Sequence, residues 1–250
     1  MMIRHYLYVL LLISTALPAV LLAGCVPKTV QAFVERGNKF FDRDDYDKAI
    51  TDYSEAIRMD PNNTAIYVSR GSAYNAIGDL DSALADFDQA LQMNNELTEV
   101  YLKRGWTYYY KGDYDKAITD LDRVIRVTTD DAWLYHLRGL VYNNKGDYDK
   151  AIEDCSEAIR LDSEYAWAYT IRGLSYYDRG DADKAIADFT EAIRIDPDDD
   201  VAFSARGKAW YNKGDFDKAI PDFEAALRLV PGRDNYREQL EETKQKYGGF

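Results

Sequence analysis

The chain repeats itself at one constant interval, and this period constrains its fold more than any other feature of the sequence. An Arg-Gly dipeptide recurs at constant phase with no insertion, and an alanine follows each glycine at a constant distance. The dipeptides are Arg36-Gly37, Arg70-Gly71, Arg104-Gly105, Arg138-Gly139, Arg172-Gly173 and Arg206-Gly207. A period of about 34 residues is typical of solenoids, in which one supersecondary unit stacks on the next.

Within one unit, the apolar and small residues follow helical spacing in two stripes. In the third unit the stripes are Tyr101, Gly105 and Tyr108, then Ala117, Leu121, Val124 and Ile125. Gly112 between them is suited to end the first helix, because glycine accepts the left-handed conformation. Asp113 or Asp115 is then expected to cap the second helix by accepting from free backbone N–H groups. Each unit is therefore predicted to be a helix hairpin.

The small residues and the charges within the unit indicate how the two helices meet. Helices approach closely only where one side chain is small, so a larger residue at Gly105 or Ala117 is expected to overpack the contact. An aspartate follows each repeated arginine at a constant distance along the chain. The spacing predicts Arg–carboxylate pairs between the two helices, with two parallel hydrogen bonds each. The aspartates are Asp52, Asp86, Asp120, Asp154, Asp188 and Asp222.

The unit resembles the tetratricopeptide repeat (TPR), which has the same period and the pattern W-x₂-L-G-x₂-Y…A-x₃-F…P. In the third unit Tyr101, Gly105, Tyr108, Ala117 and Leu121 hold the matching places, with arginine in place of the leucine. The resemblance implies an all-α, right-handed superhelical solenoid of six helix hairpins. The expected repeats are 30–63, 64–97, 98–131, 132–165, 166–199 and 200–233, followed by a capping helix and tail over 234–250.

The first residues have the pattern of a targeting segment. Arg4 precedes an apolar stretch over 6–22, and small residues stand before Cys25. The sequence Leu22-Ala23-Gly24-Cys25 resembles the lipobox of bacterial lipoproteins. That resemblance implies a signal peptide over 1–24, lipidation of Cys25 by acyl chains such as palmitate, and a short tether over 25–29. The alternative is an uncleaved N-terminal membrane helix.

Several classes of function find no support in the sequence. The formal net charge of −13 argues against nucleic-acid binding, which usually requires a basic face. Cys155 occupies a core place in its repeat, and a nucleophile would need a nearby base. The acidic run Asp196–Asp200 lacks the glycine and glutamate of a calcium loop, since Val201 and Gly207 stand at those places. We therefore expect no enzyme activity, no metal and no cofactor.

The resemblance also implies where a ligand would bind. In TPR superhelices the first helix of each pair lines a concave groove, and a few positions of that helix contact the ligand. The candidate groove residues at those positions are Val68, Leu102, Trp106, Tyr109, Tyr110, His136, Leu140, Asn143, Asn144, Thr170, Leu174, Tyr177 and Asp178. Aromatic rings there would supply buried area, and the amides would pair with the backbone of an extended peptide or a helix.

The sequence as a whole predicts a protein-binding scaffold held at a membrane by its N-terminal lipid. Its expected location is the cell envelope, on the outer membrane facing the periplasm if the host is Gram-negative. The alternative is a structural component that associates with itself and has no separate groove client. The partner and the envelope process are not specified by the sequence.

Overall fold

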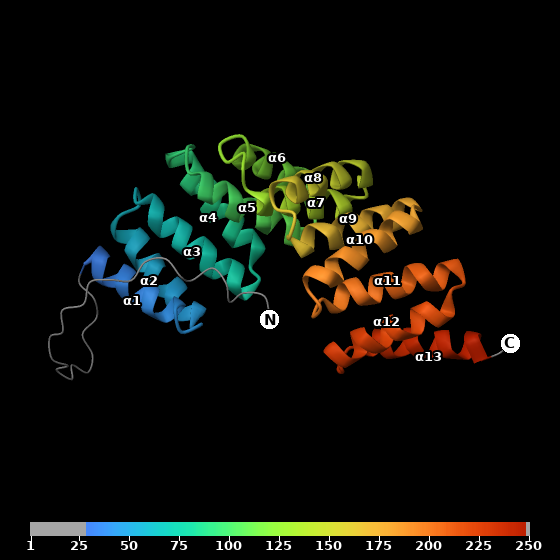
Figure 1. Cartoon of the computed structure of the whole chain (residues 1–250). Coiled ribbons are helices and arrows are strands. Elements are labelled where there is room, and N and C mark those ends of the chain that lie inside the picture. The colour runs from blue at the N-terminus through green and yellow to red at the C-terminus, as the bar shows by residue number, and fades with distance from the viewer. Residues whose placement is uncertain (1–28, 249–250) are drawn as a thin grey trace.

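The computed structural model describes residues 29–248, and these residues form thirteen α-helices and no strand (Figure 1). The predicted signal peptide and Cys25 lie outside the described residues. The helices are α1 (Val30–Phe41), α2 (Tyr46–Met59), α3 (Thr64–Ile77), α4 (Leu80–Met93), α5 (Thr98–Lys111), α6 (Tyr114–Ile125), α7 (Ala132–Lys145), α8 (Tyr148–Leu161), α9 (Ala166–Arg179), α10 (Ala182–Ile195), α11 (Asp200–Lys213), α12 (Phe216–Leu229) and α13 (Asp234–Gly248). The expected all-α solenoid of helix hairpins is confirmed.

Glycines in the left-handed conformation end the first helix of every hairpin after the first. At Gly112, where φ is 82°, the N–H of Gly112 donates to the carbonyl of Tyr109, and the next N–H donates to Tyr108. The expected role of Gly112 is therefore confirmed. In the first hairpin Asp44 takes this place with φ of 60°, a conformation that costs an aspartate more than a glycine.

The expected side-chain cap of the second helix does not form at Asp113. Asp113 stands at the N-cap position of α6, but its side chain accepts no backbone N–H. Its carboxylate instead accepts from Lys116 Nζ at 3.2 Å, one turn further on. Asp79, in the preceding repeat, does cap α4 by accepting from the N–H of Ser82.

A close approach between the two helices of each hairpin occurs at the repeated glycine. A Cβ atom at Gly173 would lie 2.6 Å from the ring of Phe189, and one at Gly139 would lie 2.7 Å from Sγ of Cys155. Gly105 is different, because a Cβ there would meet no atom closer than 3.4 Å. The expectation of overpacking therefore holds for most of the glycines and is wrong for Gly105, which faces Leu121 instead of a ring.

The predicted arginine–aspartate pairs are present in all six hairpins. Each arginine donates from Nε and from one terminal nitrogen to the two carboxylate oxygens of its aspartate, at 2.5–2.9 Å. The aspartates are buried, and the guanidinium of Arg104 also lies over the ring of Tyr101. Each pair therefore joins the two helices of one hairpin.

The same arginines connect neighbouring hairpins. The remaining terminal nitrogen of Arg104 donates to Asp88 on α4 at 2.6 Å, and that of Arg70 donates to Ser54 on α2 at 3.0 Å. Equivalent bonds join Arg138 to Asp122, Arg172 to Ser156 and Arg206 to Thr190. From the second repeat onwards, one side chain thus holds three helices together.

The array curves toward its odd-numbered helices. Among the described residues α1 contacts α3, α3 contacts α5, α7 contacts α9, and α9 contacts α11, whereas no even-numbered helix makes a comparable contact with the next even-numbered one. The resulting arch is visible in Figure 1, with α1 and α13 at its two ends. The odd-numbered helices therefore line the concave face. Over residues 29–248 no helix has the length and apolar composition needed to cross a bilayer.

The unequal glycine environments give a matched test of the hairpin contact. We expect Gly105→Ala to raise the free energy of unfolding by up to about 1 kcal/mol, because alanine is the better helix former and its methyl fits. Gly173→Ala should lower it by about 1–3 kcal/mol, because its methyl collides with Phe189. Urea denaturation of both variants measures this, and equal effects would contradict the difference between the two sites.

The arginine–aspartate pair gives a second test of stability. We expect Arg104→Met to lower the free energy of unfolding by about 3–5 kcal/mol, because Asp120 is left buried without a partner. The double variant Arg104→Met/Asp120→Leu should recover most of that loss, since it removes the buried charge as well. Chemical denaturation of the parent, the single and the double variant would contradict this account if Arg104→Met left stability unchanged.

Candidate functional site: the concave face

An aromatic cluster occupies the middle of the concave face. The ring of Trp106 stacks on Tyr110 with centroids 5.6 Å apart, and it meets Tyr109 edge-on at 5.5 Å. Trp133 on α7 lies 6.4 Å from Trp106, so the cluster spans α5 and α7. Such geometries are favourable for aromatic pairs.

The members of this cluster differ in how much surface they present. Trp106 and Tyr109 are half-buried and pack against the core around Leu121 and Leu137. Tyr110 is 69% exposed, the highest value among the exposed large hydrophobic residues of the described chain. Trp106 and Tyr109 therefore hold the cluster in place, while Tyr110 offers an open ring on a fixed support.

The asparagine side chains of the concave face are largely occupied by contacts within the array. Asn143 Nδ2 donates to Ser175 Oγ on α9 at 3.1 Å, and Asn144 Nδ2 donates to the carbonyl of Leu140 at 2.8 Å. Asn75 makes the equivalent inter-repeat bond to Thr107. The amide of Asn143 thus links α7 to α9, and its expected pairing with a ligand backbone would have to displace that bond.

Thr170 was predicted to contact a ligand, but the structure buries its side chain. Its side chain is fully buried, and its hydroxyl donates to Asp199 Oδ2 in the turn before α11 at 2.8 Å. It therefore cannot contact a ligand in this conformation. The equivalent position carries the half-buried apolar residues Val68 and Leu102 in earlier repeats, and both pack against the core around Val100.

His136 lies on the same face but is held by a neighbour. Its Nδ1 and the hydroxyl of Tyr165 are hydrogen-bonded at 3.0 Å, and its Nε2 is buried with no partner among the described residues. Burial lowers the pKa of His136 to about 4, so the ring is neutral near pH 7. A neutral, enclosed imidazole packs like an apolar side chain here.

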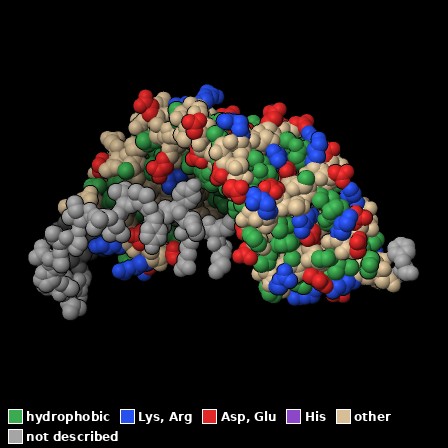
Figure 2. All heavy atoms as spheres, viewed as in Figure 1, with side chains coloured by type: hydrophobic (Ala, Val, Ile, Leu, Met, Phe, Trp, Pro, Cys, Tyr) green, Lys and Arg blue, Asp and Glu red, His purple; other side chains and the backbone are tan. Residues whose placement is uncertain are grey.

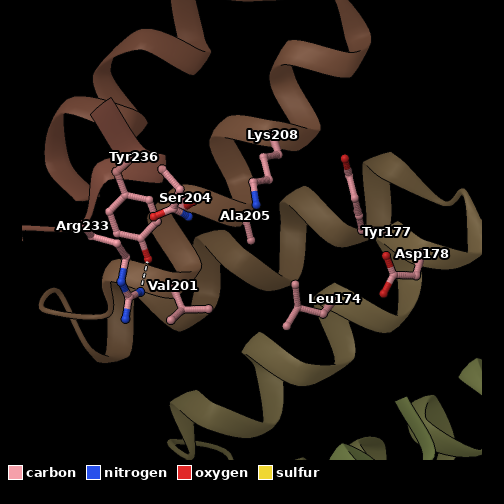
Figure 3. Close-up of a pocket in the computed structure, with 10 residues that line it drawn as sticks. Leu174, Tyr177, Asp178, Val201, Ser204, Ala205, Lys208, Arg233 and Tyr236 are labelled. Carbon is pink, nitrogen blue, oxygen red and sulfur yellow. Dashed lines mark hydrogen bonds between the residues drawn. The ribbon is translucent and has the colours of Figure 1, made fainter. Parts of the chain in front are cut away.

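Leu174, Tyr177 and Asp178 line a cavity at the C-terminal end of the concave face (Figure 3). The cavity holds about 260 Å³ and is bounded by α9, α11 and the start of α13. The Tyr177 hydroxyl accepts from Asn212 Nδ2 at 2.5 Å. The other lining residues are Val201, Ser204, Ala205, Lys208, Arg233, Asn235 and Tyr236. Six candidate residues thus fall into two places, three in the aromatic cluster and three in this cavity, and Leu140 is half-buried on α7.

The acidic side chains are mostly paired away from the concave face. Besides the aspartates that bind the repeated arginines, a row of ion pairs links the hairpin turns of successive repeats. These pairs are Lys111–Asp81, Lys145–Asp115, Arg179–Asp149 and Lys213–Asp183. Figure 2 shows acidic and basic side chains interspersed over the visible surface. The acidic side chains of these pairs therefore serve the scaffold.

Cys155 takes the core place expected from the repeat. It is fully buried against Gly139, and burial raises the pKa of its thiol. A thiol in this setting is protonated and inaccessible, unlike a catalytic thiolate. Within residues 29–248 no group of three or more potential metal ligands comes together.

Comparison with protein families matches most of the chain to one repeat family. The family described as TPR repeat matches residues 37–77 and 106–146, and families described as tetratricopeptide repeat match 64–97, 132–165 and 170–234. None of the curated proteins compared matches the chain.

Solved structures similar to this chain are also repeat proteins. The crystal structure of MamA is 31% identical, with a TM-score of 0.58 over 66% of this chain and 97% of that chain. The C-terminal part of a TPR repeat-containing protein from Cytophaga hutchinsonii is 21% identical, with a TM-score of 0.70 over 85% of each chain. YrrB, described as a TPR protein with an unusual peptide-binding site, is 21% identical, with a TM-score of 0.58 over 77% of this chain and 97% of that chain.

The buried histidine predicts a pH dependence of stability. The pKa of His136 is about 4 in the folded chain and about 6.5 when unfolded, so the unfolded state binds the proton first as pH falls. This contribution is present above about pH 6.5 and is lost as pH falls toward 4. Between pH 7.5 and 5 we expect the loss to be about 2 kcal/mol.

His136→Leu tests this dependence, since Leu102 holds the equivalent place in the preceding repeat. Urea denaturation at pH 7.5 and pH 5 should show the variant losing about 2 kcal/mol less than the parent. The carboxylates are the same in both chains, so their titration cancels in the comparison. Equal losses in the two chains would contradict the buried, neutral state of His136.

Proposed function

The chain belongs to the tetratricopeptide repeat family, and from that premise we propose that it is a scaffold that binds an extended segment or a helix of a partner protein along its concave face. The observation that carries the proposal is the aromatic cluster of Trp106, Tyr109, Tyr110 and Trp133. Exposed aromatic rings on a rigid, packed support are the usual anchors of protein interfaces. YrrB, a protein of similar fold, is described as having a peptide-binding site, which is the same class of ligand.

The N-terminal end of the array argues against self-association as the principal role. The face of each odd-numbered helix that packs on the preceding hairpin is buried inside the array, as at Ile66 and Ala73 of α3. On α1 the equivalent places hold Ala32 and Lys39, and Lys39 is exposed. A second copy stacked on this end would bury a charged side chain, which costs free energy unless it is paired.

The C-terminal end has the same polar character. Counted by the repeat period, α13 stands at the place of the first helix of a seventh unit. Where α11 carries Phe203, Gly207 and Trp210, α13 carries Arg237, Glu241 and Lys244, all exposed. These charged side chains cover the face on which a further helix would pack, as expected of a capping element. Both ends therefore favour a single array with an open groove over head-to-tail assembly.

We further propose that Cys25 is lipidated and holds the array at a membrane of the cell envelope. The support is the resemblance of Leu22–Cys25 to a lipobox. Two or more acyl chains give stable anchoring, whereas one gives only reversible binding. Since α1 begins at Val30, the first repeat would stand within a few residues of the lipid. Mass spectrometry of the N-terminal peptide, with Cys25→Ser as the control, tests the modification.

The groove assignment is tested by crosslinked capture of partners from the solubilised envelope with the full chain as bait. We expect Tyr110→Ser to reduce recovery of a specific partner at least tenfold, because a central aromatic anchor contributes roughly 2 kcal/mol at many interfaces. Tyr110 is exposed, so the variant should keep its fold. Trp106→Ala should reduce recovery further, with its helicity and unfolding midpoint measured alongside.

Tyr247→Ser is the matched control, because Tyr247 is also exposed but lies on α13, outside the aromatic cluster. It should leave recovery unchanged. Equal recovery by the parent and both tyrosine variants would contradict binding at the aromatic cluster. Recovery of the bait alone, with sedimentation that depends on its concentration, would favour the self-associating alternative.

A further inference from the structure

The cavity at the C-terminal end of the concave face contains a cation that has no partner. Lys208 extends from α11 into the hollow bounded by α9 and α11 (Figure 3). It is half-buried. Its side chain makes no hydrogen bond or ion pair within the part of the chain that the structure describes. An unpaired ammonium group beside a cavity is available to a ligand of opposite charge.

Lys208 is unusual among the basic residues of this array. Most lysines and arginines in residues 29–248 form ion pairs with carboxylates. The others that lack a carboxylate partner are Lys39, Arg43, Arg123, Arg126 and Arg228, and all of them are exposed to solvent. Lys208 is thus, within the described residues, the one basic residue that is both unpaired and half-buried. In a chain with a net charge of −13, an unpaired lysine at this place points to a ligand.

Three other donors around the cavity, on Arg233, Tyr236 and Ser204, have partners within the chain. Arg233 and the hydroxyl of Tyr236 both donate to Asp200 Oδ2 at 2.7 Å, and Ser204 Oγ donates to Gln239 Oε1 at 3.2 Å. Lys208 is therefore the charged donor that remains available. Apolar surface from Leu174, Val201 and Ala205 surrounds it, which strengthens an ionic contact by excluding water.

We propose that Lys208 binds a carboxylate side chain, Asp or Glu, of the partner segment that occupies the concave face. The inference rests on the proposed function and adds the chemistry of the partner. Its segment would carry apolar residues against the aromatic cluster of α5 and α7 and an acidic residue toward α11. The cavity, at about 260 Å³, has room for several waters and so for one such side chain.

The surroundings favour a side chain over a chain end or a phosphate. Lys208 does not lie on the last helix of the array, because α13 follows α11 and accepts at Glu242 from the Tyr211 hydroxyl at 2.5 Å. A bound segment can therefore run past Lys208 and reach it with a side chain. Asp178 lines the same cavity, and its negative charge opposes a phosphate dianion more strongly than a single carboxylate.

The test uses an mRNA-displayed library of random dodecapeptides whose C-termini are covalently joined to their mRNA, so that side chains supply the only peptide carboxylates. The baits are the full chain in detergent micelles, its Lys208→Met variant and the matched control Lys39→Met, which removes an exposed, unpaired lysine. We expect peptides selected on the parent and on Lys39→Met to carry Asp or Glu at a fixed distance from apolar residues. Selection on Lys208→Met should keep the apolar residues and lose the acidic one.

A selected peptide then gives the size of the effect. Changing its acidic residue to the amide should weaken binding to the parent about 10- to 100-fold, as expected for a charge-assisted hydrogen bond. The same change should leave binding to Lys208→Met nearly unaffected. Raising the salt concentration should weaken binding to the parent more than to Lys208→Met.

The outcomes separate this inference from the proposed function. Peptides that bind the parent, lose affinity for Tyr110→Ser and show no acidic preference would overturn the role of Lys208 and leave the groove intact. An acidic preference retained on Lys208→Met would also overturn it. Recovery of no peptides, or of peptides that bind Tyr110→Ser as well as the parent, would count against the proposed function and this inference together.

Discussion

Each hairpin depends on how closely its two helices approach, and in every hairpin but the third the repeated glycine leaves room for a side chain of the second helix. Because Gly173 has no side chain, the ring of Phe189 can lie where a Cβ atom would stand. The short separation brings Arg172 within reach of Asp188 on the second helix. A larger residue would push the helices apart and break the packing and the ion pair together. The curvature of the array, and so its concave face, follows from repeating this contact at a constant period.

The arginine–aspartate pairs convert this local contact into a continuous array. A buried ion pair alone is weak evidence of stability, because desolvation offsets much of the attraction. Here the guanidinium also bonds to the preceding hairpin, as Arg138 does to both Asp154 and Asp122. Its position therefore depends on two repeats at once, which fixes their relative orientation. The aspartates of these pairs serve the scaffold, so their number says little about the ligand.

The repeated contacts were predictable from the sequence because each is set within one repeat unit. The spacing of Arg104 and Asp120 predicts their pair correctly, since the two helices meet in the same way in every copy. Contacts that form in only some of the repeats were not predictable. Thr170 is buried because Asp199, in the turn before α11, accepts its hydroxyl, and the amide of Asn143 is taken by Ser175. The cavity at Lys208 needs Arg233 and Tyr236 from the end of the last repeat and beyond it, so it could not be located from one unit alone.

The distribution of these contacts bears on where specificity can reside. The amides of Asn75 and Asn143 are each bonded to the helix two places further along the chain, so changing either would weaken the array itself. Tyr110 and Lys208 carry no such bond, and their replacement leaves the inter-repeat contacts in place. Residues that make no contact between repeats can vary without loss of the fold. Recognition of a partner is therefore expected to depend mainly on such residues. If the proposed function is right, the aromatic cluster and the cavity are the parts of this concave face that would distinguish one partner from another.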